Sequence, residues 1–178
     1  MKPESSSLAS YIRTIPDFPK QGIMFRDITT LLKDAHAFER AVDVLTARYK
    51  AEQISKVVCI ESRGFVLGAA LALRLQAGFV PIRKKGKLPA ATLRQEYALE
   101  YGSDAVEIHR DAIQPGERIL IHDDLLATGG TVTAACKLVE NLGGTIVGLS
   151  FLVELSFLKG RARLGSYDVF SIIQYDSE

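Results

Sequence analysis

Short runs of apolar, β-branched residues alternate with helix-forming segments, and this alternation constrains the fold more than any other feature of the chain. Lys56–Ile60 and Phe79–Ile82 have the composition of buried strands. The Ala- and Leu-rich segment 65–76 between them predicts a helix. Together they form one strand–helix–strand unit.

A second unit of the same kind follows. Arg118–Asp123 predicts a strand, Thr131–Leu142 a helix that Gly143-Gly144 ends, and Thr145–Val153 another strand. Repeated units of this order predict the α/β class, with a mostly parallel sheet flanked by helices on both faces. No repeat or linker divides residues 1–178, so we expect a single domain.

Two further elements complete the expected fold. Asp34 is placed to cap a helix in which Phe38, Ala41 and Leu45 recur at helical spacing. Residues 92–110 are typical of an antiparallel hairpin with its turn near Gly102-Ser103. We expect this hairpin to project from the sheet as an arm that closes like a lid.

The charge and apolar patterns exclude several classes of protein. Twenty-two basic and 21 acidic residues leave a net charge of +1, which argues against a general grip on nucleic acid or an anionic membrane surface. The most apolar window, residues 64–82, contains Arg74 and Gln76 and is too interrupted to span a bilayer. Met1–Ser10 lacks the pattern of a signal peptide, and Cys59 and Cys136 are expected to be buried free thiols in the cytoplasm.

The turn after strand 118–123 carries the clearest chemical signal. Asp123 and Asp124 end that strand, and a loop containing Gly129-Gly130 leads into the next helix. Such a loop presents free backbone N–H groups and the positive end of the helix dipole to an anion. Thr128 and Thr131 add hydroxyl donors. We therefore expect a phosphate group in the loop and sugar hydroxyls on the two carboxylates.

Alternative interpretations of this loop were weighed. Paired acids after an apolar strand also occur in nucleoside triphosphatases, and Gly-Gly by itself forms simple turns. The chain has neither the G-x-x-x-x-G-K-[ST] motif of those enzymes nor the G-x-G-x-x-G motif of dinucleotide-binding proteins. From the sequence of this loop alone, a simple Gly-Gly turn remains an alternative interpretation.

Several ordered segments together are similar to a known family. The run 119–131 resembles the loop by which type I phosphoribosyltransferases bind phosphoribosyl diphosphate (PRPP). The other segments resemble those of the adenine phosphoribosyltransferases within that family, and they are Asp17–Thr29, Ser62–Phe65, Arg83–Pro89, Leu99–Gly102 and Leu152–Leu155. The resemblance covers the chain from about residue 11 to its C-terminus. It implies transfer of a phosphoribosyl group from PRPP to N9 of adenine, giving AMP and pyrophosphate.

The resemblance also assigns roles in binding PRPP. It implies that Asp123 and Asp124 bind the ribose hydroxyls and that Mg²⁺ is held mainly by the substrate and water rather than by the protein. The 5′-phosphate would be bound by Ala127, Thr128, Gly129, Gly130 and Thr131, and the pyrophosphate by Arg63, Lys84 and Lys87. A solvated basic loop is the alternative for residues 83–87. In many members the peptide before Arg63 is cis.

For the base and the reaction, the resemblance points to an N-terminal base-binding segment and to the arm. Adenine would lie against the backbone of Met24 and Arg26, with Phe25 and Leu155 packing on its ring. Ordinary core packing is the alternative for Phe25 and Leu155. Glu100 would be the catalytic carboxylate and Tyr101 part of the lid, although a surface Glu would look the same in isolation.

The sequence departs from the family pattern at two positions, and two rival functions can be considered. Gln21 stands where the family usually has Pro, and His122 where an aliphatic residue is common; His122 could add a weak pH dependence. A phosphoribosyltransferase for another base and a PRPP-sensing DNA regulator are the rivals. The segments around Phe25 and Glu100 argue against the first, and the absence of a basic recognition helix near the N-terminus argues against the second. A homodimer is expected from the family alone.

Overall fold

The computed structural model of the protein describes residues 8–98 and 103–177, and a twisted sheet of seven strands forms its centre. Five of these strands are parallel to their neighbours, and two at one side are antiparallel. Their spatial order is β5 (Thr92–Ala98), β6 (Ser103–His109), β4 (Gly78–Lys84), β3 (Lys56–Ile60), β7 (Arg118–Leu126), β8 (Thr145–Leu155) and β9 (Val169–Tyr175).

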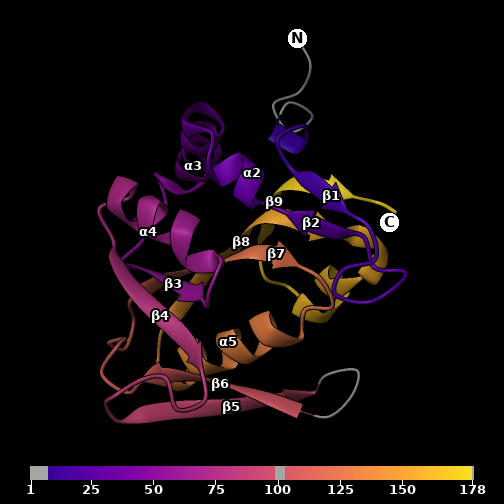
Figure 1. Cartoon of the computed structure of the whole chain (residues 1–178). Coiled ribbons are helices and arrows are strands. Elements are labelled where there is room, and N and C mark those ends of the chain that lie inside the picture. The colour runs from indigo at the N-terminus through magenta and orange to yellow at the C-terminus, as the bar shows by residue number, and fades with distance from the viewer. Residues whose placement is uncertain (1–7, 99–102, 178) are drawn as a thin grey trace.

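Helices cover both faces of the sheet, as the alternation of elements predicts (Figure 1). The helices α3 (Ala35–Tyr49) and α4 (Gly64–Arg74) lie on one face and α5 (Gly130–Asn141) on the other. Successive residues of β3 accordingly enter different cores. Val57 packs with α3 and α4, whereas Val58 packs with α5. The α/β fold with a mostly parallel sheet is therefore confirmed.

Most predicted elements occur at their predicted positions, with shifted ends. The Asp34 side chain caps α3 by accepting a hydrogen bond from the backbone N–H of Ala37 at 2.9 Å. The main correction concerns β7, which was expected to end at the acidic pair but continues through Asp123 and Asp124 to Leu126. It does so because β8 also extends beyond its predicted end and pairs with it up to Glu154.

The hairpin is formed by β5 and β6, but it does not project freely. Figure 1 shows α5 between the parallel strands of the sheet and this hairpin, which forms the sheet's antiparallel side. Leu93 and Tyr97 of β5 pack against the core around α5, because alternate residues of the strand form an apolar face. The predicted turn near Gly102-Ser103 largely lies outside the described residues.

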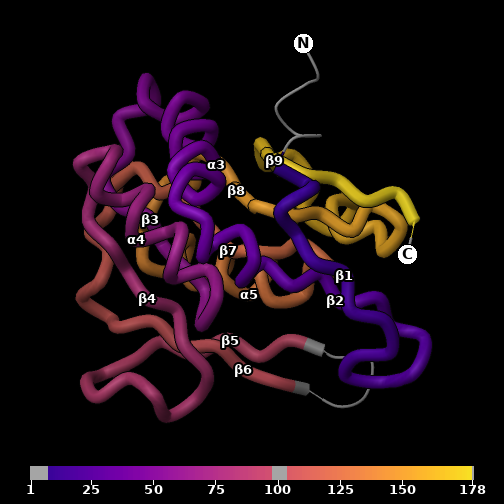
Figure 2. The backbone as a smooth tube through the Cα atoms, turned by 45° about the horizontal axis from the view of Figure 1, so that its top comes forward, coloured from indigo at the N-terminus to yellow at the C-terminus, as the bar shows by residue number. Residues whose placement is uncertain are grey.

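A small two-stranded sheet, β1 (Arg13–Ile15) and β2 (Phe25–Asp27), stands apart from the large one and leads to α2 (Thr29–Leu32). Figure 2 shows it on the side of the molecule toward which the β5–β6 hairpin points. One carboxylate, that of Asp27, ties the segment together. It accepts hydrogen bonds from Thr29 N at 2.9 Å, Thr29 Oγ1 at 2.6 Å and Arg13 Nε at 3.1 Å.

Replacing Asp27 by Asn should lower stability and alter its pH dependence. The hydrogen bonds from Thr29 and then from Arg13 lower the pKa of Asp27 from 3.8 to about 2. A lowered pKa stabilises the fold above pH 3.8, and the contribution is lost as the pH falls toward 2. We expect Asp27→Asn to reduce the free energy of unfolding at pH 7 by about 2 kcal/mol.

Denaturant unfolding between pH 7 and 2 would measure this effect. Asp43→Asn is the control, because the Asp43 side chain is 57% exposed and lies 3.8 Å from its partner Arg74. An unchanged loss of stability below pH 4 in Asp27→Asn would contradict the assigned role.

Candidate active site

The residues predicted to bind the phosphate, ribose and pyrophosphate gather where the carboxyl ends of β3, β4 and β7 meet the first turns of α4 and α5. This is the edge at which open α/β sheets bind ligands. Two cavities adjoin there and share Asp123, Leu125 and Thr131. One, of about 190 Å³, lies in the turn between β7 and α5, and the other, of about 340 Å³, extends toward β3, β4 and the hairpin.

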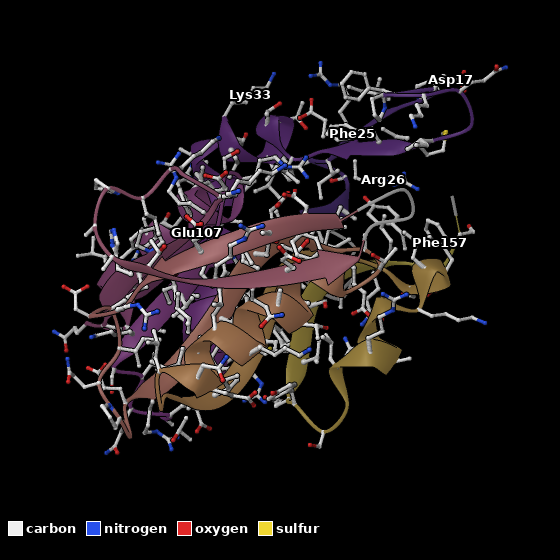
Figure 3. The ribbon with its side chains drawn as sticks, turned by 90° about the horizontal axis from the view of Figure 1, so that it is seen from below. Asp17, Phe25, Arg26, Lys33, Glu107 and Phe157 are labelled. Carbon is white, nitrogen blue, oxygen red and sulfur yellow. The ribbon has the colours of Figure 1, made fainter. Side chains whose placement is uncertain are left out.

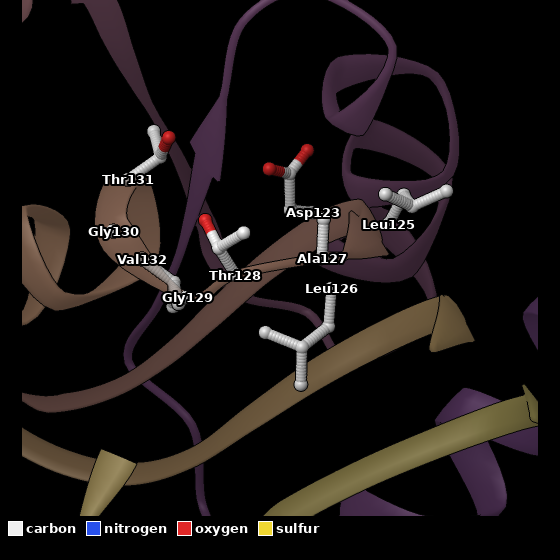
Figure 4. Close-up of a pocket in the computed structure, with 9 residues that line it drawn as sticks. All are labelled: Asp123, Leu125, Leu126, Ala127, Thr128, Gly129, Gly130, Thr131 and Val132. Carbon is white, nitrogen blue, oxygen red and sulfur yellow. The ribbon is translucent and has the colours of Figure 1, made fainter. Parts of the chain in front are cut away.

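The first cavity is built by the glycine-containing turn. Its lining runs from Leu125 to Val132 together with Asp123, and so includes the whole predicted phosphate loop. Gly129 has a positive φ of 81°, which glycine adopts without strain, and it precedes the first residue of α5. In Figure 4 the Asp123 carboxylate and the Thr128 and Thr131 hydroxyl groups lie on the same side of this turn. The geometry suits an anion at the N-terminus of α5.

A second backbone segment supports the loop from behind. The 3₁₀ turn η2 (Gly160–Leu164) packs so closely that a Cβ atom on Gly160 would lie 2.0 Å from the carbonyl oxygen of Ala127 and 3.1 Å from Gly129 N. Arg161 of the same turn donates to the buried carboxylate of Glu154 on β8, with its Nε 2.9 Å from Oε1. Gly160 could not be predicted from the sequence, because no local pattern shows that these distant segments meet.

The acidic pair lies at the junction of the two cavities. The Asp123 carboxylate accepts a hydrogen bond from the backbone N–H of Asp124 at 2.8 Å. Asp124 is 5% exposed, and its Oδ2 lies 2.9 Å from Arg63 Nε. Burial raises the pKa of both carboxyls, and the neighbouring Asp124 charge raises that of Asp123 further, while Arg63 acts in the opposite direction. Buried acids of this kind are frequent in functional sites.

The three predicted pyrophosphate-binding cations all lie at this edge, each beside a carboxylate. Arg63 pairs with Asp124, Lys84 Nζ lies 3.2 Å from Asp104, and Lys87 Nζ lies 3.4 Å from Glu61. Arg63 and Lys84 line the larger cavity, whereas Lys87 is not part of its lining. The cations are thus neutralised within the protein, and the sequence analysis foresaw neither Asp104 nor Glu61 as their partners.

The turn before α4 shows one difference from the expected backbone. The non-proline cis peptide joins Glu61 and Ser62, one bond before the Ser62–Arg63 peptide to which the resemblance pointed. Sequence similarity indicates the turn but cannot fix which of two adjacent bonds is cis.

The predicted adenine-binding residues come from the small N-terminal sheet and from β8. Figure 3 shows Phe25 and Arg26 on the N-terminal segment. The Arg63 guanidinium lies 5.2 Å from the centre of the Phe25 ring, so Phe25 reaches the larger cavity's cationic wall. The Arg26 guanidinium stacks over Tyr175 at 4.0 Å. Met24 is half-buried beside them, and Leu155 packs partly against the core around α3 and α4.

Glu100 and Tyr101 lie outside the described residues, so their roles stay predictions. Another hairpin residue, Tyr97, lines the larger cavity, and its hydroxyl group interacts with the side chain of Thr131. The alternation of β5 could have placed Tyr97 on the inward face, but only the fold of the hairpin over α5 brings it to the cavity.

The two departures from the family pattern lie away from the cavities. Gln21 is exposed in the connection between β1 and β2. His122 is fully buried, and its Nδ1 lies 2.9 Å from Ser150 Oγ. Burial lowers the pKa of His122 to about 4, so this side chain is neutral at neutral pH and adds no charge to the site.

Known proteins resemble this chain over nearly its whole length. Residues 29–177 match the phosphoribosyl transferase domain. The adenine phosphoribosyltransferase of Acidobacterium capsulatum is 60% identical over 168 residues, which are 94% of this chain and 93% of that protein. The corresponding enzyme of Chloroflexus aurantiacus is also 60% identical, over 94% of this chain and 97% of its own.

Solved structures agree. The adenine phosphoribosyltransferase of Thermoanaerobacter pseudethanolicus superposes with a TM-score of 0.93 at 52% identity, covering 96% of this chain and 99% of that one. The Saccharomyces cerevisiae enzyme, solved with adenine and an imino-altritol bisphosphate, gives a TM-score of 0.90 at 39% identity over 94% and 97% of the two chains. The chain therefore belongs to the phosphoribosyltransferase family, and within it to the adenine phosphoribosyltransferases.

Proposed function

We propose that the two cavities hold PRPP and that the chain transfers its phosphoribosyl group to N9 of adenine, releasing AMP and pyrophosphate. One observation carries this proposal. A glycine turn at a helix N-terminus, an acidic pair of which Asp124 is buried, and a group of cations meet at a single edge of the sheet. These are the donors and acceptors that a phosphate, a ribose and a pyrophosphate require, in that order.

The phosphate and ribose would occupy the adjoining cavities. Residues 127–131 would bind the 5′-phosphate through the free N–H groups of the turn and the hydroxyls of Thr128 and Thr131. Asp123 and Asp124 would accept hydrogen bonds from the ribose hydroxyls. Asp123 lines both cavities and Asp124 lines the larger one, and these positions support the role because the ribose links the phosphate to the pyrophosphate.

The pyrophosphate would be bound by Arg63, Lys84 and Lys87. Because each of these cations already has a carboxylate partner, the cavity alone offers little net positive charge to a multiply charged anion. The described residues contain no group of three or more His, Cys, Asp or Glu that could hold a metal ion. We propose that Mg²⁺ would be held mainly by the oxygens of PRPP and by water, and that it would supply charge neutralisation for the departing pyrophosphate.

Adenine would bind between the N-terminal segment and the end of β8. The backbone of Met24 and Arg26 would recognise its edge, while Phe25 and Leu155 pack on its ring. The contact of Phe25 with Arg63 supports this placement, because it brings the base-binding segment next to the pyrophosphate site. The two reacting groups would then meet in one place.

Glu100 is proposed to manage the purine proton while N9 attacks the anomeric carbon, and Tyr101 to help cover the site. The transition state resembles an oxocarbenium ion, which water would capture. Exclusion of water is the proposed task of the arm. The position of Tyr97 in the wall of the larger cavity supports this task, since Tyr97 precedes Glu100 and Tyr101 by only a few residues in the same hairpin.

We also propose a single-domain, cytoplasmic homodimer. Phe79 of β4 and Val66 and Leu73 of α4 are exposed apolar residues, and the Leu73 side chain is 79% exposed. Apolar residues of this kind favour a protein partner. Both cysteines are buried and free, which suits a reducing compartment. Among the described residues no helix is long and apolar enough to cross a membrane, and we propose neither a membrane nor a nucleic-acid partner.

Measuring the reaction with different purine bases tests the proposed function directly. Adenine presents a donor at its 6-amino group and an acceptor at N1, whereas hypoxanthine and guanine present the reverse pattern. A backbone pocket cannot rotate to match the reverse pattern, and each unsatisfied buried group costs about 1–3 kcal/mol. We expect kcat/KM to favour adenine over both 6-oxopurines by about 10⁴ or more at saturating PRPP and Mg²⁺. Comparable values for a 6-oxopurine would overturn the choice of adenine but not the transfer reaction.

Asp123→Asn should separate stability from PRPP binding. A raised carboxyl pKa stabilises the fold fully only below pH 3.8, and this contribution is lost as the pH rises through the folded-state pKa. The ionised group therefore opposes folding at pH 7, and the variant should have a higher Tm. Its KM for PRPP should rise by about tenfold or more, because charge-assisted hydrogen bonds are lost. The exposed Asp111→Asn is the control, and an unchanged KM would remove the ribose role.

Gly160→Ala should weaken phosphate binding indirectly, because residue 160 is not itself proposed to contact the ligand. The new methyl group would meet the Ala127 carbonyl and must displace the loop. We expect kcat/KM for PRPP to fall by roughly 10- to 100-fold, since displacements of about 1 Å have effects of that size. Ala162→Ser, on the exposed side of the same turn, should be silent. A folded Gly160→Ala variant with normal PRPP kinetics would show that η2 does not position the loop.

A further inference from the structure

The side chain of Lys84 is held by one carboxylate of the hairpin. Lys84 Nζ lies 3.2 Å from Oδ2 of Asp104, which belongs to β6. The other oxygen, Oδ1, accepts a hydrogen bond from the backbone N–H of Ala105 at 2.8 Å. Asp104 is therefore oriented by its own strand and cannot readily turn away from Lys84. Solvent can reach the Lys84–Asp104 ion pair, because the Lys84 side chain is 58% exposed.

Tyr97 joins the same group from the opposite strand. The register of β5 and β6 places Tyr97 directly across from Asp104, so that both side chains leave the hairpin on one face. The Tyr97 hydroxyl donates to Asp104 Oδ2 at 3.3 Å and also interacts with Thr131 of the phosphate loop. Through these two side chains the hairpin contacts both the cation and the anion-binding turn.

We propose that Asp104 is a positioning residue, which holds the Lys84 ammonium at the cavity wall in the place where it binds pyrophosphate. The inference rests on the proposed function, because it takes Lys84 to be a pyrophosphate ligand. A long, mostly exposed lysine loses much conformational freedom when it binds, and holding it in place beforehand reduces that loss. Lys87 differs, since the side chain of its partner Glu61 is only 7% exposed and also accepts from Arg83 Nε at 2.7 Å.

The geometry favours positioning over competition with the substrate. An ammonium group has three N–H donors, and Asp104 takes one of them. The remaining donors can reach a pyrophosphate oxygen while the ion pair persists. Lys84 also lines the larger cavity together with Arg63 and Thr131, whereas Asp104 is not among its lining residues. The cation therefore borders the cavity, and the carboxylate that holds it does not.

Asp104→Asn tests the inference, because the amide oxygen can still accept from the Ala105 N–H, while an uncharged NH₂ group replaces the Oδ2 atom that faces Lys84 and Tyr97. We expect the KM for PRPP to rise by roughly two- to fivefold, the upper part of the range for a partly exposed charged pair. The kcat and the KM for adenine should stay within about twofold, because these do not depend on the free enzyme's hold on Lys84. Isothermal titration with magnesium pyrophosphate should show weaker binding by the same factor. Glu96→Gln is the matched control, since Glu96 is a 65% exposed hairpin carboxylate paired with Arg94.

Lys84→Met, alone and combined with Asp104→Asn, separates the failure of this inference from that of the proposed function. Lys84→Met should raise the KM for PRPP, and adding Asp104→Asn should then have no further effect. A normal KM in Lys84→Met would remove the pyrophosphate role of Lys84 itself. A raised KM there, with no change or a lower KM in Asp104→Asn, would leave that role standing and overturn the positioning role of Asp104.

Discussion

The parallel pairing of β3 with β7 is the constraint on which the candidate site depends. It sets Cys59 beside His122, so that the turn after β3 and the acidic pair of β7 emerge at one edge. Arg63 follows the first strand and Asp124 belongs to the second, and their ion pair at 2.9 Å requires this register. A shift by one residue would send alternate side chains to the opposite face of the sheet. Both cores, which take alternate residues of β3, would be lost with it.

The charges at this edge are arranged in pairs rather than as a positive patch. Asp124, Asp104 and Glu61 each accompany one of the cations proposed to bind pyrophosphate. This arrangement explains how a chain with a net charge of +1 can assemble several cations in a partly buried place. Isolated buried charges would be costly, whereas paired ones are tolerated. The same pairing orients the cations before any ligand arrives.

The sequence predicted those parts of the molecule that local pattern controls. The apolar runs gave β3 and β7, Asp34 gave the start of α3, and the Gly129-Gly130 turn gave the anion-binding loop, because each depends on neighbouring residues. The small strands β1 and β2 and the edge strand β9 were not foreseen. β9 is defined by its pairing with β8, a contact that no short stretch of sequence reveals.

The site residues can likewise be separated into those that the local sequence predicts and those that it does not. The acidic pair and the loop are contiguous in the sequence and were predicted from it, with the resemblance to a family adding Arg63, Lys84 and Lys87. Gly160, Tyr97 and Asp104 were missed, because each acts through a segment that is distant in sequence. Tyr97 became visible only when the expected free arm proved to lie against α5. Tertiary packing, rather than composition, gives these residues their place.

The position of β5 at the outside of the sheet has a consequence for the behaviour of the protein in concentrated solution. An outer strand offers unpaired backbone N–H and C=O groups to any passing chain, and exposed, flat, apolar strands seed aggregates. In β5 the inward Leu93 and Tyr97 alternate with the outward Arg94 and Glu96, which pair with each other at 2.7 Å. A strand of another chain could pair with β5 only by packing its side chains against those of Arg94 and Glu96. These charges therefore disfavour pairing of the hairpin's outer strand with a strand of another chain.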